Sequence, residues 1–180
     1  MPVNIEIKAR VRDPVRLRAL AEALSRAPGT LLSQEDTFFH TPQGRLKLRT
    51  LSPTQGELIY YERANATGPR PSRYQMVQTH LPDALRATLA TALGVRGRVR
   101  KQRWLYSVGQ TRVHLDEVEG LGVFVELEWI MQAGQTIETG TRVVSELMQR
   151  LDIAAADLIA GAYIDLLGVE DEDGTHHEHT

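Results

Sequence analysis

The feature that most constrains the fold is a strict alternation of polar and apolar residues, which recurs in short segments along the chain. In residues 4–12 the apolar side chains of Ile5, Ile7, Ala9 and Val11 fall on one face of a strand and the polar side chains on the other. An α-helix, with its period of 3.6 residues, would not separate them in this way. The pattern predicts strands, each with one apolar and one charged face, over residues 4–12, 45–49, 57–63, 98–108, 111–116 and 123–131.

Helix-like segments lie between these strands. Asp13 followed by Pro14 is typical of a helix N-cap with proline in the first turn, and Pro28-Gly29 would end that helix. Other helices are predicted near 82–93, 139–151 and 154–167, and a surface loop over 65–72, where glycine and prolines cluster. We therefore expect an α+β chain with one domain over 1–168 and a disordered, acidic, histidine-containing tail over 169–180, whose histidines either chelate metal or are simply solvated.

The charged faces differ from strand to strand. Cations occupy one face in 45–49 and again in 101–103, whereas carboxylates occupy the face of residues 126 and 128. A solvated sheet face is the ordinary explanation for such strands, but solvated faces usually mix both signs. A concave face lined by separate cations and carboxylates would suit a polyphosphate, because Lys and Arg bind phosphate oxygens and carboxylates bind Mg²⁺ or Mn²⁺.

The net charge of −2 conceals a strong asymmetry. Residues 1–112 contain 19 Lys and Arg against 8 Asp and Glu, and residues 113–180 contain 2 against 15. The near-neutral sum argues against a general nucleic-acid partner. The asymmetry indicates either a basic body with an acidic tail or one site that draws cations from the first part and carboxylates from the second.

Several classes of chemistry are excluded. The chain has no cysteine, which rules out disulfides, thiolate metal ligands and a cysteine nucleophile. No apolar run is long enough to cross a membrane, and the first residues do not resemble a secretory signal, so we expect a cytoplasmic protein with no membrane partner. There is also no Gly-x-Gly-x-x-Gly or Walker A motif.

The ordered set of motifs resembles the CYTH domain family, also known as the triphosphate tunnel metalloenzymes. Asn4-Ile5-Glu6-Ile7-Lys8 is similar to the Glu-x-Glu-x-Lys signature of that family, except that Asn4 replaces the first Glu. Further matches follow in the family's order, at Asp36-Thr37-Phe38-Phe39, Leu46-Lys47-Leu48-Arg49, Lys101-Gln102-Arg103, the stretch from His114 to Glu128, and Ala162 to Leu167.

The resemblance implies a closed eight-stranded antiparallel β-barrel, or tunnel, with helices packed on its outside and a triphosphate bound inside with Mg²⁺ or Mn²⁺. The implied metal ligands are Glu6, Asp116, Glu126 and Glu128. The implied phosphate-binding residues are Lys8, Arg10, Lys47, Arg49, Arg63, Arg73, Lys101 and Arg103. Glu6, Lys8 and Asp116 are the residues expected to act in the reaction itself, and the neutral Asn4 weakens one metal position.

The function implied by the resemblance is metal-dependent hydrolysis of a phosphoanhydride in a small-molecule triphosphate such as tripolyphosphate, ATP or thiamine triphosphate. The alternatives are a class IV adenylyl cyclase, which converts ATP to cyclic AMP and pyrophosphate, and a non-catalytic module that binds polyphosphate or nucleotide. Family members are often dimers, so a homodimer is also expected. From the residues alone, His114 is either a proton relay or a structural histidine, Trp104 and Trp129 either stack on a base or pack in the core, and Tyr163 is expected to be structural.

Overall fold

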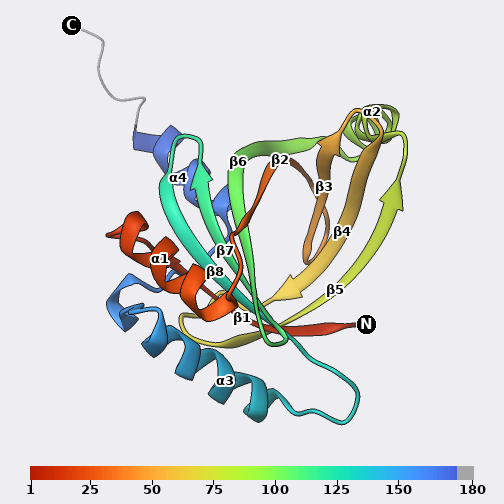
Figure 1. The fold of residues 1–180 in the computed structure, drawn as a ribbon. Helices are drawn as coiled ribbons and strands as arrows, with labels where there is room; N and C mark the ends of the chain where they lie inside the picture. Colours follow the sequence, from red (N-terminus) through yellow and green to blue (C-terminus); the bar gives the residue numbers. More distant parts are fainter. Residues whose placement is uncertain (174–180) are drawn as a thin grey trace, which may run out of the picture.

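The chain folds into a closed barrel of eight antiparallel strands (Figure 1). The computed structural model describes residues 1–173, and side chains as far as Gly168. The order around the barrel is β1-β5-β4-β3-β2-β6-β7-β8, and β1 closes it by pairing with both β5 and β8. The predicted fold class is therefore confirmed. The strands are β1 (Val3–Arg10), β2 (Thr30–Phe39), β3 (Arg45–Ser52), β4 (Gln55–Arg63), β5 (Arg70–Thr79), β6 (Val95–Val108), β7 (Thr111–Val118) and β8 (Gly122–Ile130).

Residues 1–173 contain four α-helices, α1 (Pro14–Ser25), α2 (Pro82–Leu93), α3 (Ile137–Arg150) and α4 (Tyr163–Asp173), which lie outside the barrel except for the start of α4. The start predicted for α1 is confirmed, because the Asp13 side chain accepts a hydrogen bond from the backbone N–H of Arg16. In Figure 1, α1 and α3 lie together on one side of the barrel and α2 lies on the opposite side. No helix in the described part of the chain is long and apolar enough to span a membrane.

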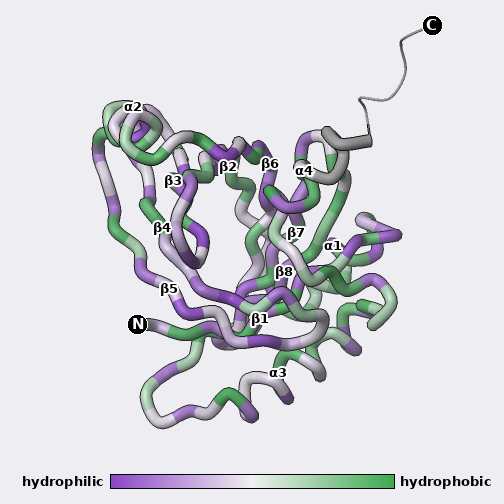
Figure 2. Tube along the Cα trace, turned by 180° about the vertical axis from the view of Figure 1, so that it is seen from behind, coloured by the Kyte–Doolittle hydropathy of each residue, from purple (hydrophilic) through white to green (hydrophobic). Residues whose placement is uncertain are grey.

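The main hydrophobic core lies between the outer surface of the barrel and helices α1 and α3. It is formed by the apolar faces of β1, β7 and β8, and Trp129 belongs to it, as predicted for a packing role. Gly140 of α3 lies so close to this wall that a Cβ there would be 2.5 Å from side-chain atoms of Ile5 and Trp129. Because the apolar faces point outward to the helices, the polar faces point into the barrel, and hydrophilic and hydrophobic residues alternate along the strands in Figure 2.

One end of the barrel is filled by the start of α4. Tyr163 and Ile164 pack there with aromatic and aliphatic residues from the strand ends, and the Tyr163 and Phe124 rings meet edge to face with centroids 5.1 Å apart. The remaining interior is a cavity of about 370 Å³. The second core cluster thus closes the end of a polar cavity.

Parts of the sequence prediction are wrong. No continuous helix covers 154–167: after a short 3₁₀ turn at Ala155–Asp157, the chain runs beside β1, where Ile159 N–H donates to the Lys8 carbonyl at 2.8 Å. The loop predicted over 65–72 ends early, because β5 begins at Arg70 and Ser72 is buried. The alternation also missed β2 and β5, since four polar residues in succession, 33–36, obscure the period in β2. The tail predicted over 169–180 overlaps α4, and its residues 174–180 lie outside the described residues.

Candidate functional site

The cavity is lined by every second residue of the barrel strands. Asn4, Glu6 and Lys8 come from β1, and Glu126 and Glu128 from the neighbouring β8. Lys8 pairs with Glu126 in register, so opposite charges face one another there, whereas the next inward pair is two carboxylates, Glu6 and Glu128. The other charged residues that line the cavity are Asp36, Lys47, Arg49, Glu57, Arg63, Lys101, Arg103 and Arg112.

Asp36 of β2 holds three of the cations together. Its carboxylate accepts two hydrogen bonds from the Arg49 guanidinium, at 2.8 and 2.9 Å, and one from Lys101 Nζ at 3.0 Å, and Lys47 Nζ lies 3.3 Å away. Burial would raise the pKa of Asp36, but the charges of Arg49, Lys101 and Lys47 hold it well below its usual value. Three positive charges thus share one negative partner, which leaves a local excess of positive charge.

The pKa of Lys101 is lowered by its burial and, to a smaller extent, by this local excess of positive charge. Its side chain is buried, and burial lowers the pKa of Lys101 to about 7. Asp36 opposes this shift, while the neighbouring Arg49 and Arg103 cations reinforce it. Lys101 therefore changes charge near neutral pH, unlike a surface lysine.

Glu126 is the centre of a second group of contacts. It accepts hydrogen bonds from Lys8 Nζ at 2.9 Å and from Arg103 at 3.0 Å, and His114 Nδ1 lies 3.5 Å away. Burial would raise the pKa of Glu126, but Lys8, Arg103 and His114 hold it well below its usual value. Glu126 is therefore a partly buried carboxylate that stays ionised.

Asp116 and Tyr163 support this second group from behind. Asp116 is fully buried and accepts two hydrogen bonds from the Arg103 guanidinium, both at 2.7 Å, and one from the Tyr163 hydroxyl at 2.8 Å. The Tyr163 ring lies under the Lys8 ammonium, 3.6 Å from Nζ to the ring centroid. These contacts fix the directions in which Lys8 and Arg103 point.

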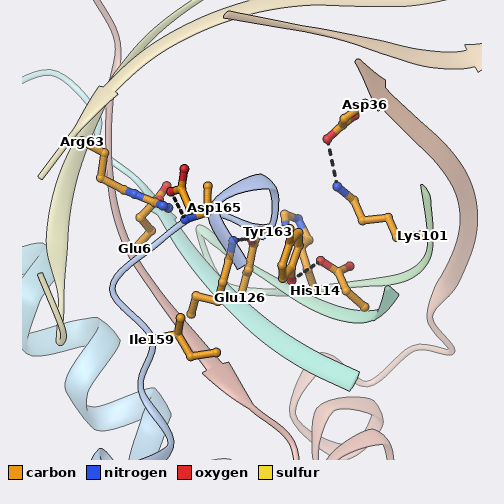
Figure 3. A network of polar contacts seen from close by, with 12 residues as sticks. Glu6, Asp36, Arg63, Lys101, His114, Glu126, Ile159, Tyr163 and Asp165 are labelled. Atoms are coloured by element: carbon orange, nitrogen blue, oxygen red, sulfur yellow. Dashed lines mark hydrogen bonds and ion pairs between the residues drawn. The ribbon is translucent and has the colours of Figure 1, made fainter. Parts of the chain in front are cut away.

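Figure 3 shows Glu126, His114 and Tyr163 between two further ion pairs, Arg63 with Glu6 on one side and Lys101 with Asp36 on the other. Burial raises the pKa of Glu6, and Arg63 partly opposes this while Glu128 and Glu126 add to it. The cavity therefore holds cations around its wall with carboxylates between them.

His114, Glu126 and Glu128 form a group that could ligate a metal ion. One ligand atom from each lies within 4.8 Å of the others, and β7 and β8 bring the three residues together because His114 pairs with Glu126 in register. Two carboxylates and an imidazole are donors that fit a divalent cation. Asn4 lines the same cavity and offers a neutral amide oxygen where the resembled motif has a glutamate.

Most of the predicted site residues line the cavity, and three do not. Those that do are Glu6, Lys8, Lys47, Arg49, Arg63, Lys101, Arg103, Glu126 and Glu128. Asp116 lies behind Arg103 rather than in the cavity wall. Arg10 is exposed at the end of β1, and Arg73 is exposed because Ser72 and Tyr74 take the inward positions of β5. We therefore do not retain Asp116 as a metal ligand, or Arg10 and Arg73 as phosphate contacts.

Sequence reasoning missed Asp36 and undervalued His114 and Tyr163. Asp36 had a signal, since it alternates with Gln34 and Phe38, which both line the cavity. Tyr163 lies in the motif match from Ala162 to Leu167, but its contact with Lys8 could not be predicted, because it depends on the packing of α4 into the barrel end.

Comparison with known proteins gives consistent similarities over most of the chain. A family model described as CYTH domain matches residues 3–163. Adenylate cyclase CyaB of Aeromonas hydrophila is 27% identical over 172 residues, which cover 89% of this chain and 86% of the relative. Two solved structures share the fold. The PH1012 protein of Pyrococcus horikoshii OT3 superposes with a TM-score of 0.78 at 24% identity, and the match covers 91% of this chain and 98% of the PH1012 chain. A candidate adenylate cyclase from Vibrio parahaemolyticus superposes with a TM-score of 0.74 at 23% identity, and the match covers 92% of this chain and 97% of the Vibrio chain.

Proposed function

The chain belongs to the CYTH domain family, and on this premise we propose that it is a divalent-metal-dependent enzyme that cleaves a phosphoanhydride bond of a triphosphate inside the barrel. Hydrolysis is the reaction we propose first. The observation that carries the proposal is the convergence of cations from five strands on one enclosed cavity that also contains carboxylates.

The cations are placed to neutralise a chain of phosphates. Arg49 and Arg103 each present a guanidinium already oriented by a bidentate carboxylate, and Lys8 is oriented by Glu126 and the Tyr163 ring. Groups fixed in advance in this way stabilise the charge on transferring phosphoryl oxygens without reorganising during the reaction. The ion pairs that hold them would exchange in part for phosphate oxygens.

The donor set in the cavity fits a divalent metal ion. Glu126 and Glu128 are the carboxylates we propose to hold it, and Glu6 lies across from Glu128 on β1. A bound Mg²⁺ or Mn²⁺ would polarise a phosphoryl oxygen and neutralise charge on the substrate. Direct contact between these carboxylates and phosphate would be repulsive, which is why their presence favours a metal-bound substrate.

The nucleophile is proposed to come from solvent or from the substrate. The chain contains no cysteine, and the Tyr163 hydroxyl donates a hydrogen bond to Asp116. Burial, with Glu126 and Asp116 nearby, raises the pKa of Tyr163 well above its usual value, so the phenol remains protonated. A water molecule as nucleophile gives a triphosphatase.

A hydroxyl of the substrate as nucleophile gives the second candidate, an adenylyl cyclase. Two observations favour it. The relative from Aeromonas hydrophila is an adenylate cyclase, and the cavity wall also contains the apolar side chains of Leu32, Leu51, Ile59 and Leu105, which could accommodate an organic group. A non-catalytic binding module remains the third possibility.

Product analysis separates the three functions. The protein is incubated with tripolyphosphate, ATP or thiamine triphosphate, with Mg²⁺ or Mn²⁺. We expect orthophosphate as a product. Cyclic AMP with pyrophosphate would establish the cyclase instead, and binding without turnover would leave the binding module. If none of these triphosphates binds, the proposal is wrong.

The unusual pKa of Lys101 gives a prediction for affinity. Lys101 loses its proton as the pH rises through about 7, so the cavity loses one cation and should bind polyphosphate less tightly. Between about pH 6.5 and pH 8.5 we expect metal-free tripolyphosphate binding, measured by calorimetry, to weaken by about 10-fold more in the wild type than in Lys101→Arg, because Arg stays charged. Equal pH profiles for the two proteins would contradict this role of Lys101.

A further inference from the structure

We propose that the metal site of this cavity is a mixed nitrogen and oxygen site in which His114 is a ligand beside Glu126 and Glu128, so that it selects Mn²⁺ over Mg²⁺. The proposal rests on the function proposed above only in placing the metal in the same cavity. It concerns which side chains coordinate the ion and which ion they prefer.

The register of β7 and β8 places the imidazole where a ligand is needed. His114 lies directly opposite Glu126, and Glu128 is the next inward residue of β8. The three ligand atoms lie within 4.8 Å of one another, slightly more than the about 4.4 Å that two donors at about 2.2 Å from one ion can span, so small side-chain shifts would let all three bind it. Glu126 already accepts from Lys8 and Arg103, but a carboxylate has about four lone-pair sites and can bind an ion as well.

Asp116 is enclosed by Arg103 and Tyr163 and does not line the cavity. Glu6 lies opposite Glu128 and is paired with Arg63, so it would reach the ion only by giving up part of that pairing. His114 supplies a third donor beside Glu126 and Glu128. Its contact with Glu126, at 3.5 Å, is too long for a strong hydrogen bond, so the ring is not committed to that carboxylate.

The side chain of Asn4 gives independent support for a cation bound in this part of the cavity. Its side chain is 7% exposed and lines the cavity, yet its Oδ1 atom has no hydrogen-bond partner among the described residues. Asn4 pairs with Ile130, which puts it diagonally across from Glu128 on the same inner face. A buried carbonyl oxygen without a donor is costly, and a cation would satisfy it.

The donor types decide which ion is preferred. Mg²⁺ demands octahedral oxygen ligands and gives up its water reluctantly. Mn²⁺ also prefers oxygen donors, but as a larger first-row transition metal ion it loses water more readily and accepts one imidazole at less cost. The imidazole of His114 therefore favours Mn²⁺ over Mg²⁺.

The test uses the full chain with His176, His177 and His179 replaced by Ala, so that the tail contributes no imidazole. Mn²⁺ alone is titrated, and the bound ion is examined by pulsed electron paramagnetic resonance. We expect an imidazole ¹⁴N coupling to the bound Mn²⁺ and binding at least about 10-fold tighter than that of Mg²⁺. The absence of this coupling overturns the proposal, and this measurement does not depend on any substitution inside the barrel.

Substitutions in the same background sharpen the result. His114→Ala should weaken Mn²⁺ binding by about 10- to 100-fold while changing Mg²⁺ binding less. His114→Asp, which makes the donors all oxygen, should narrow the preference for Mn²⁺, and His40→Ala, at an exposed histidine, should change neither ion. Unchanged Mn²⁺ affinity in folded His114→Ala overturns the assignment. Failure of the proposed function is separate, since it would appear as normal Mn²⁺ binding without turnover of any triphosphate.

Discussion

Glu126→Gln is expected to reduce turnover of the triphosphate by about 1,000-fold or more, because it removes the charge that holds Lys8 and Arg103 and, on our proposal, a ligand of the metal. The amide has the same shape as the carboxylate, so the barrel should remain folded. Glu128→Gln should also abolish turnover. The measurement is the rate of product release under saturating metal, with folding checked by circular dichroism.

A second readout distinguishes loss of chemistry from loss of binding. Without metal, Glu126 repels phosphate, so Glu126→Gln should bind tripolyphosphate at least as tightly as the wild type. Glu117→Gln is the matched control, since Glu117 is exposed and points away from the cavity on β7. Activity like that of the wild type in both Glu126→Gln and Glu128→Gln would exclude these residues as metal ligands.

Asp36→Asn is expected to cause the largest loss of stability among single substitutions of the cavity. Asp36 is 1% exposed and is the common partner of Arg49, Lys101 and Lys47. Removing one member of a buried ion pair typically costs about 3–5 kcal/mol, because the remaining charge stays buried. At about 2–4 °C per kcal/mol for a chain of this size, the melting temperature should fall by about 6–20 °C.

Added tripolyphosphate can take the place of the Asp36 carboxylate beside the three cations. Tripolyphosphate should raise the melting temperature of Asp36→Asn more than that of the wild type, because it restores negative charge beside the three cations. Since the pKa of Asp36 is depressed by folding, the wild type has this stabilisation above the usual aspartate range and loses it only as the pH falls through the lowered pKa. Asp83→Asn is the control, because the Asp83 side chain is 75% exposed and pairs with Arg86 at the surface. A melting temperature for Asp36→Asn within about 3 °C of the wild type would show that the cations do not need this partner.

The faces of β1, β6, β7 and β8 could be predicted from the sequence because alternation is a local property. The inward direction of Glu6, Lys8, Glu126 and Glu128 follows from it once the apolar face is assigned to the helices. The closed barrel was implied by the resemblance to the CYTH domain family, which the ordered motifs carry. The inward direction of these side chains could be predicted without knowing which strands pair.

The partners of the charged groups could not be predicted, because they depend on register between strands. Arg103 lies directly opposite Asp116, so a carboxylate expected to bind metal instead orients a guanidinium. Likewise, Asp36 is opposite Arg49 in β3, while β6 brings Lys101 to it from the other side. In β5 the resemblance implied Arg73 as a phosphate contact, whereas the pleat directs Ser72 inward.

The closure of the barrel by β1 has a consequence for how the protein forms. Ile5, near the start of the chain, pairs with Trp129, so the first strand must wait for the last one before its hydrogen bonds on that side can form. Contacts so distant in sequence must be made against a large loss of chain entropy, and folds that depend on them assemble slowly. Lys8 and Glu126 face each other across this same seam. The Lys8–Glu126 part of the site is therefore formed only when β1 pairs with β8 and the barrel closes.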